Sequence, residues 1–167
     1  FAIAELEKDW DVTVITQNVD NLHERAGSTR IIHLHGELTK VRPENCYNEM
    51  DNYSEEKVFD IGYDTIKLGD LAPNGAQLRP HIVWFGEAVP YINAAIDHVM
   101  RADVLLIVGT SLQVYPAAGL YAYANADTPI YIIDPGSVPV RDGRITHIKE
   151  VATKGMETFK NLINSNL

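Results

Sequence analysis

Polar side chains follow the apolar run Val12–Ile15 at once, in the stretch TQNVDNLHERAG (Thr16–Gly27). The stretch places the amides of Gln17 and Asn18 and the carboxylate of Asp20 close to a histidine. Polar groups so near a buried strand lose free energy unless they find partners. A bound ligand is one such partner, so this stretch is a candidate binding segment.

Other apolar runs of the chain also end in groups that form hydrogen bonds. The polar ends are His35-Gly36, Gly109-Thr110-Ser111 and Asp134-Pro135-Gly136. A single polar end would mean little, because turns are polar anyway. Ligands of open α/β sheets bind beyond the carboxyl ends of the strands, so these ends together indicate one shared crevice.

The stretch VGTSLQVYPAAG could hold an anion. Gly109 frees the backbone, two hydroxyls follow, and a helix is predicted to begin near Pro116. Backbone N–H groups and a helix dipole at such a place favour a phosphate. An ordinary strand-to-helix loop is the alternative. The chain has neither G-x-G-x-x-G nor G-x-x-x-x-G-K-[ST], so a standard dinucleotide fingerprint or P-loop is absent.

His33 and His35 stand two residues apart, so both point to one face of a regular strand. A metal site would need further ligands from elsewhere, and no acid or thiol is obviously placed to supply them. An isolated strand histidine is usually structural. His35 ends its strand and meets Gly36, where a substrate can approach closely, so its imidazole could act as a general base near neutral pH.

The stretch RPHIVWFGE (Arg79–Glu87) carries two adjacent aromatic residues before a glycine. It could be a core strand or a loop packed under another part of the chain. Alternatively, it could be an extended edge whose backbone groups pair with a substrate peptide.

Composition excludes several classes of function. The formal net charge of −9 argues against binding a phosphate backbone; it would attract cationic peptides or serve solubility alone. No apolar run approaches the length of a membrane span. Cys46 is the one cysteine, so this chain can build neither a disulfide framework nor a four-thiolate zinc site, and a reducing, cytoplasmic location is expected.

Strands alternate with helices along the chain, which is typical of an α/β fold with a parallel sheet. The strands are predicted at Val12–Thr16, Arg30–His35, Asp103–Val108, Pro129–Ile133 and Thr146–Val151, and the helices at Tyr91–Arg101, Ala117–Asn125 and Gly155–Asn164. Residues 37–80 break the pattern and are expected to form a small, partly irregular inserted lobe. Residues 1–36 and 81–167 would then form the main domain.

Four stretches together resemble the sirtuins, the NAD-dependent protein lysine deacylases, especially the bacterial type. TQNVDNLHERAG is similar to the family's TQN-[IV]-D-x-L-H-x-x-AG, LHGEL to its catalytic histidine-glycine, RPHIVWFGE to its substrate-binding FGE segment and GTSLQVYPAAG to its GTS-x-x-V-x-P nucleotide loop. They occur in the family's order. The resemblance implies a Rossmann-like fold and NAD as co-substrate.

The resemblance also implies roles for single residues. Gln17 and Asn18 would hold the nicotinamide ribose, Asp20 would bond the nicotinamide carboxamide, and Asn18 and His35 would be the catalytic residues. Gly109, Thr110 and Ser111 would contact phosphate and ribose. The segment of Val83, Trp84, Phe85, Gly86 and Glu87 would bind the acyl-lysine of a protein or peptide.

In the reaction that the resemblance implies, the acyl-lysine carbonyl oxygen attacks the ribose anomeric carbon and nicotinamide departs. His35 then deprotonates a ribose hydroxyl, so that the acyl group can migrate to the sugar. Water completes the reaction and gives free lysine and O-acyl-ADP-ribose.

The chain departs from the family first in its zinc module, which uses two pairs of cysteines where this chain has only Cys46. We therefore expect no zinc and a lobe held by packing. The residues expected to form its apolar core are Tyr47, Tyr53, Val58, Phe59, Ile61, Tyr63 and Ile66.

A second departure is Asp134, where the family often has asparagine on the adenosine ribose. A carboxylate can accept hydrogen bonds from both ribose hydroxyls and disfavours a 2′-phosphate, so NAD is expected over NADP.

The third departure is that the family's first glycine-rich strand-loop-helix is missing. In the Rossmann order that strand is central, so the strands near Val12 and Arg30 would be separated from those near Asp103 and Pro129. Either residues upstream of Phe1 supply the strand, which is the alternative that we favour, or another chain fills the gap, or the sheet closes differently. An exposed edge would encourage chains to pair or swap. Alternatives to a deacylase are a non-catalytic or ADP-ribosylating NAD-binding relative and an inactive structural fragment.

Overall fold

The computed structural model describes residues 1–44, 57–139 and 142–165. By their contacts, the residues divide into two units, Thr13–Tyr91 and the combination of Phe1–Val12 with Ile92–Leu167. The boundaries at residues 36 and 80 that the sequence suggested both fall inside the first unit. The domain division based on them stays a prediction.

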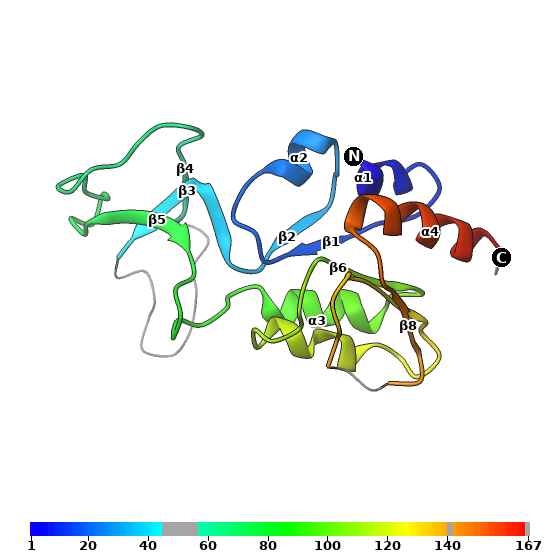
Figure 1. The fold of residues 1–167 in the computed structure, drawn as a ribbon. Helices are drawn as coiled ribbons and strands as arrows, with labels where there is room; N and C mark the ends of the chain where they lie inside the picture. Colours follow the sequence, from blue (N-terminus) through cyan, green and yellow to red (C-terminus); the bar gives the residue numbers. More distant parts are fainter. Residues whose placement is uncertain (45–56, 140–141, 166–167) are drawn as a thin grey trace. The chain divides into compact units, whose positions relative to one another are not determined.

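The first unit begins with a parallel pair of short strands, β1 (Val14–Thr16) and β2 (Ile31–His33). The helix α2 (Leu22–Ala26) lies between them in the chain and is drawn in blue in Figure 1. Both strands lie within the predicted ranges. β2 stops early because Leu34 and His35 form the turn that leads into the next strand.

Residues 37–80, expected to be partly irregular, contain most of an antiparallel sheet. Its strands are β3 (Gly36–Pro43), β4 (Phe59–Asp60) and β5 (Leu78–Ile82), in the order β4-β3-β5. Figure 1 shows β3 and β5 side by side. The pairing of β3 with β5 is interrupted between Glu37 and Val41. This bulge breaks the alternation by which a strand is recognised in a sequence.

The interior of the lobe differs from the predicted apolar core. The prediction is wrong for Phe59 and Tyr63, whose side chains are exposed, and Tyr47 and Tyr53 lie outside the described residues. Val58, Ile61 and Ile66 are half-buried. The buried residues come mainly from β3 and β5, namely Val41, Arg42 and His81, together with Ala72. Two of these, Arg42 and His81, carry polar side chains, so the pattern of apolar residues did not predict that they are buried.

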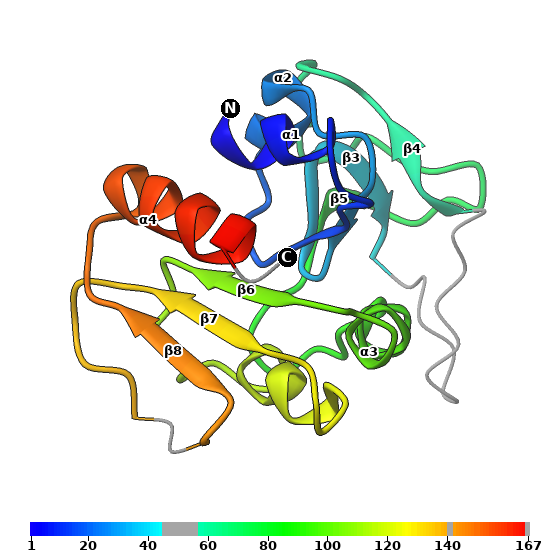
Figure 2. The ribbon, with the colours of Figure 1, turned by 90° about the vertical axis from the view of Figure 1, so that its right-hand side faces the viewer.

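The second unit contains a three-stranded parallel sheet in the order β6-β7-β8. Its elements are α1 (Ala2–Leu6), α3 (Ile92–Met100), β6 (Leu105–Val108), the 3₁₀ helix η2 (Ala117–Tyr123), β7 (Ile130–Ile133), β8 (Ile145–Ile148) and α4 (Ala152–Ser165). Figure 2 shows α4 on one face of this sheet and α3 on the other. All four residues of β7 are buried, as expected for a central parallel strand covered on both faces.

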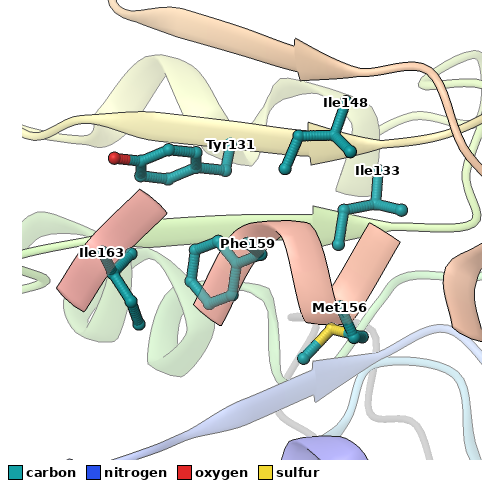
Figure 3. Packing of buried hydrophobic residues seen from close by; sticks show 6 residues of the cluster. All are labelled: Tyr131, Ile133, Ile148, Met156, Phe159 and Ile163. Atoms are coloured by element: carbon teal, nitrogen blue, oxygen red, sulfur yellow. The ribbon is translucent and has the colours of Figure 1, made fainter. Parts of the chain in front are cut away.

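The core of this unit lies between the sheet and α4 (Figure 3). Met156, Phe159 and Ile163 recur at helical spacing on α4, and they pack against Tyr131, Ile133 and Ile148 of the sheet. The rings of Tyr131 and Phe159 meet edge to face, with centroids 5.1 Å apart. A Cβ on Gly155 would lie 2.3 Å from a methyl group of Ile133, so only glycine allows this close approach of helix and strand.

The predicted α/β class and the strands near Val12, Arg30, Asp103, Pro129 and Thr146 are confirmed. The parallel strands fall into two sheets, β1-β2 and β6-β7-β8, the separation expected without a central strand. The helix predicted at Ala117–Asn125 is a 3₁₀ helix that ends at Tyr123. In the described part of the chain, no helix is both long and apolar enough to cross a membrane.

Candidate functional site

The loop after β1 carries the first group of predicted site residues. The backbone N–H of Asn18 donates to Thr16 Oγ1 at 3.1 Å, and that of Leu22 donates to Asp20 Oδ1 at 3.0 Å. Asp20 thus uses one carboxylate oxygen to hold the start of α2, and within the described part of the chain Oδ2 is open to a ligand. The side chains of Asp20 and Gln17 are half-buried and Asn18 is exposed.

His35 lies in the turn between β2 and β3, and its ring is held by the same loop. Its Nδ1 lies 3.2 Å from the carbonyl oxygen of Gln17. A carbonyl oxygen can only accept, so Nδ1 is the donor in this contact, and in the neutral ring the lone pair then lies on Nε2. The contact therefore orients the imidazole and presents Nε2 as a base.

Gly36, the residue after this histidine, is required by the packing of β3 on β5. Its φ is +78°, a conformation that favours glycine, and an added Cβ would lie 1.9 Å from the carbonyl oxygen of His81. Any side chain at this position would push β3 away from β5. The histidine-glycine pair thus combines a candidate base with the close strand contact beside it.

The candidate substrate segment begins where β5 ends. The backbone N–H of Val83 donates to the carbonyl oxygen of His35 at 2.9 Å. The side chains of Trp84 and Phe85 that follow are exposed, and that of Phe85 is 97% accessible. Large apolar groups in this position are available to pack against a ligand. The structure therefore brings Gln17, His35 and Val83 into one hydrogen-bonded chain.

Glu87 closes this segment and contacts protein groups on both carboxylate oxygens. Arg79 Nη1 donates to Oε1 at 2.6 Å, Arg42 Nη2 donates to Oε2 at 3.1 Å, and the backbone N–H of Trp84 donates to Oε2 at 3.0 Å. Burial would raise the pKa of Glu87, but these donors and the two positive charges bring it below its ordinary value. The carboxylate of Glu87 thus holds the turn of the segment.

Sequence reasoning missed the role of Arg42 and Arg79, which face each other across β3 and β5. Two like charges directly opposite would repel, and the carboxylate of Glu87 relieves that repulsion. The available signal was the repeated dipeptide Arg-Pro, at Arg42 and at Arg79. Beside them, burial and the charges of Arg42 and Lys40 lower the pKa of His81 to about 4, so that ring is neutral at pH 7.

A possible metal cluster among the described residues consists of Glu24, His33 and Glu37, whose ligand atoms lie within 4.8 Å of one another. His35 is outside this group. Lys40 Nζ already donates to Glu37 Oε2 at 2.6 Å, and His33 forms hydrogen bonds to protein oxygens. Cys46 lies outside the described residues. That the protein holds no zinc stays a prediction.

The second unit holds the remaining predicted residues at the carboxyl ends of β6 and β7. The backbone N–H of Gly109 donates to the carbonyl oxygen of Ile133 at 3.1 Å, which brings Gly109 next to Asp134. Asp134 Oδ1 accepts from the backbone N–H of Gly136 at 2.7 Å, and Oδ2 is left for a ligand. Adjacent carboxyl ends of parallel strands are where ligands bind in open α/β sheets.

The loop of Gly109, Thr110 and Ser111 supports a phosphate contact through its backbone more than through a helix. The N–H of Leu112 donates to Thr110 Oγ1 at 3.2 Å. Among the described residues, no backbone acceptor pairs with the N–H groups of Thr110 and Ser111, so both are open to a ligand. The following η2 has seven residues and 3₁₀ geometry. The dipole of such a short element contributes less than the α-helix expected there.

Comparison with known proteins shows which family this chain belongs to. Residues 1–116 match the sequence model of the Sir2 family. An NAD-dependent protein deacylase of Bacteroides thetaiotaomicron is 51% identical over 164 residues, which cover 96% of this chain and 68% of that protein. An NAD-dependent protein deacylase of Helicobacter pylori strain 26695 is 56% identical over 134 residues, 80% of this chain and 55% of that protein.

Solved structures of Sir2 proteins also align with this chain. A Sir2 homologue in complex with NAD aligns with a TM-score of 0.79 and 35% identity, over 99% of this chain and 63% of that one. A complex of Sir2 with a p53 peptide and NAD⁺ aligns with a TM-score of 0.71 and 30% identity, over 99% of this chain and 69% of that one. The chain thus spans 55–69% of the length of the relatives described here.

Proposed function

The chain belongs to the Sir2 family, and from this we propose that the protein removes acyl groups from protein lysines, consuming NAD and giving nicotinamide and O-acyl-ADP-ribose. Two relatives compared above are named NAD-dependent protein deacylases. One solved relative is bound to NAD, and another to a p53 peptide with NAD⁺. Membership of the family agrees with the sirtuin resemblance of the four sequence stretches.

The observation that carries this proposal is the placement of His35. Its ring is fixed by the carbonyl of Gln17 on the candidate cofactor loop, at 3.2 Å, and its own carbonyl fixes Val83 at 2.9 Å. One residue therefore joins the candidate cofactor loop to the candidate substrate segment. Nε2 is the nitrogen with a lone pair, which is what a general base needs.

The residues present suit a nicotinamide nucleotide. NAD supplies a ribose carbon from which nicotinamide can leave as the acyl oxygen attacks. Gln17 and Asn18 would hold that ribose, Asp20 would bond the carboxamide through Oδ2, and His35 Nε2 would take the proton of a ribose hydroxyl. We assign Asn18, together with His35, as a catalytic residue.

The residues of the second unit suit the other end of the nucleotide. The backbone N–H groups of Thr110 and Ser111 would donate to phosphate, where Gly109 allows a close approach. Asp134 Oδ2 would accept from the hydroxyls of the adenosine ribose, as acidic residues do in other dinucleotide sites.

The acyl-lysine would bind along Val83–Gly86. An extended peptide pairs with backbone groups at such an edge, and exposed aromatic rings cover its apolar part. Val83 and Gly86 would supply backbone contacts, and Trp84 and Phe85 would pack against the acyl chain. Glu87 would keep the segment in the right shape through its bonds with Arg42 and Arg79.

The test is a deacylation assay on the full-length protein with an acetyl-lysine peptide and NAD, in which nicotinamide and free lysine are both measured. We expect equal amounts of the two products, and a loss of at least about 100-fold in kcat for His35→Ala, the scale of general-base catalysis. His98→Ala, which removes an imidazole from α3, is the matched control and should keep full activity.

Other outcomes would support the alternatives. Nicotinamide released without free lysine would indicate an ADP-ribosylating relative, and the absence of NAD binding would indicate a structural role. Undiminished deacylation by His35→Ala would remove the assigned base. A cytoplasmic location, supported by the single cysteine, and pairing of chains through a sheet edge are further proposals, to be checked by fractionation and light scattering.

A further inference from the structure

His33 has no part in the roles described so far, although it shares the spacing that drew attention to His35. Its side chain is buried, with 6% of its surface exposed. Nε2 lies 2.8 Å from Glu24 Oε1 and Nδ1 lies 3.2 Å from the carbonyl oxygen of Asn18. Contacts at both nitrogens of a buried ring fix its position and orientation.

Both partners of His33 are hydrogen-bond acceptors. A carbonyl oxygen never donates, and an ionised carboxylate only accepts. The two contacts are therefore both hydrogen bonds when the ring carries both protons. The hydrogen bond to a charged partner is also the stronger kind.

The two histidines hold consecutive residues of one loop. His35 Nδ1 contacts the carbonyl of Gln17, and His33 Nδ1 contacts the carbonyl of Asn18, at 3.2 Å each. Fixing these two carbonyls fixes the two peptide planes that flank the Cα of Asn18, and so the direction in which its side chain leaves the backbone. Glu24 extends this support to α2, on the far side of the loop.

We propose that Glu24 and His33 form a brace that positions Asn18, and with it Asp20, for the nicotinamide end of NAD. The brace rests on the proposed function, because it acts through residues assigned there to the cofactor. His33 and Glu24 are positioning residues, since neither is placed against NAD itself.

A metal ion shared by Glu24, His33 and Glu37 is the competing use of these side chains. The ring nitrogens of His33 already face protein oxygens, and Lys40 neutralises Glu37 at 2.6 Å. The partners on the protein therefore account for each of these groups, and the brace needs no ion.

The test measures the binding of NAD and of AMP to the full-length protein by calorimetry. AMP has no nicotinamide ribose, so it probes only the loop of Gly109 and the carboxylate of Asp134. His33→Phe keeps the volume of the ring but removes both donors. We expect this variant and Glu24→Ala to lower the affinity for NAD roughly tenfold and to leave the affinity for AMP unchanged. Glu24→Gln keeps an oxygen toward Nε2 and should lose less than Glu24→Ala.

Glu37→Ala is the matched control, because it removes a carboxylate near His33 that has no hydrogen bond to the ring. It should leave the affinities for NAD and AMP unchanged. In the nucleotide-free protein, the ring ¹⁵N shifts of His33 should differ between the wild type and Glu24→Ala, because the contact at Nε2 is lost.

The outcomes separate the brace from the proposed function. The brace is refuted, and the deacylase proposal stands, if His33→Phe binds NAD as tightly as the wild type does. The same holds if the affinity of His33→Phe for AMP falls as much as its affinity for NAD. If the wild type fails to bind NAD, the proposed function falls and the brace falls with it. Ring ¹⁵N shifts of His33 that are the same in the wild type and in Glu24→Ala would also refute the brace.

Discussion

The carbonyl oxygen of His35 accepts a hydrogen bond from the backbone N–H of Val83 at 2.9 Å. The bond lies directly beyond the last paired residues of the two strands, Gly36 and Ile82. The sheet of the lobe thus ends at the residue that carries the candidate base and at the residue that begins the candidate substrate segment. A displacement of either strand would move both.

Replacing Glu87 by alanine should weaken substrate binding and destabilise the protein. Arg42, whose side chain is 1% exposed, would lose its ion pair with Glu87, and its charge would still lie opposite that of Arg79. We expect a loss of about 1–3 kcal/mol in the free energy of unfolding in urea, and a KM for the acyl-peptide that rises roughly tenfold while the KM for NAD changes little. Glu5→Ala, which breaks an exposed ion pair with Lys160, should change the free energy of unfolding far less than Glu87→Ala does. Equal losses in the free energy of unfolding for Glu87→Ala and Glu5→Ala would show that the contacts of Glu87 with Arg42 and Arg79 add no stability.

The same carboxylate should make stability depend on acid. The pKa of Glu87 is lower in the folded protein than its ordinary value, because the donors and charges around it outweigh burial. A lowered pKa means that the stabilisation is present above the ordinary glutamate range and is lost as the pH falls through the folded value. In urea titrations at several pH values, the difference between wild type and Glu87→Ala should therefore shrink toward acid. A difference that grows toward acid would contradict this sign.

Gly36→Ala should disrupt the lobe through overlap, beyond the effect of backbone conformation. Gly75 offers the matched control: its φ of +80° is nearly the +78° of Gly36, but nothing lies within 4 Å of a Cβ added there. We expect Gly75→Ala to cost about 1–2 kcal/mol from the left-handed conformation alone. Gly36→Ala should cost at least about 4 kcal/mol in unfolding experiments, the range of severe substitutions. Similar losses in the free energy of unfolding for the two variants would show that the backbone moves to relieve the overlap between the new Cβ and the carbonyl oxygen of His81.

Asp134 should set the preference for NAD over NADP. Its carboxylate would repel a 2′-phosphate, so Asp134→Asn should bring the dissociation constants of NAD and NADP closer by roughly tenfold. Calorimetry on the full-length protein measures both constants. Comparable constants in the wild type would remove the assigned role of Asp134.

The core on α4 should dominate the stability of the second unit. Phe159 is 3% exposed and meets Tyr131 edge to face, so Phe159→Ala should lower the free energy of unfolding by about 3–5 kcal/mol. Phe59, which is 37% exposed, is the matched control, and Phe59→Ala should cost less than half as much. Nearly equal losses would mean that Phe59 is buried in solution.

The second unit could be predicted in detail because its pattern is regular. The run Ile130–Ile133 is apolar throughout, and Met156, Phe159 and Ile163 repeat at helical spacing, so β7 and α4 lie close to their predicted positions. In contrast, α2 has only five residues, too few to show a period, and η2 follows the tighter 3₁₀ geometry. A lobe was predicted at residues 37–80, but its strands and its core were not, because buried Arg42 and His81 interrupt its apolar positions.

The candidate site could be predicted only in part for a related reason. Polar residues at strand ends, and the family resemblance, pointed to His35 and the loop after β1. The contacts that support them join residues that no spacing rule connects. Glu24 bonds His33 nine positions away, and Arg42 bonds Glu87 across 45 positions. Such partners become visible only when the chain is folded.

The carboxylate of Glu87 has one further chemical consequence. Its two equivalent oxygens let β3, β5 and the turn after β5 share one side chain, through Arg42, Arg79 and the N–H of Trp84. An amide of the same length has one oxygen and one NH₂ group, so it would turn a donor toward a guanidinium. Glutamine is therefore a poor mimic at this junction, even though its shape is nearly identical.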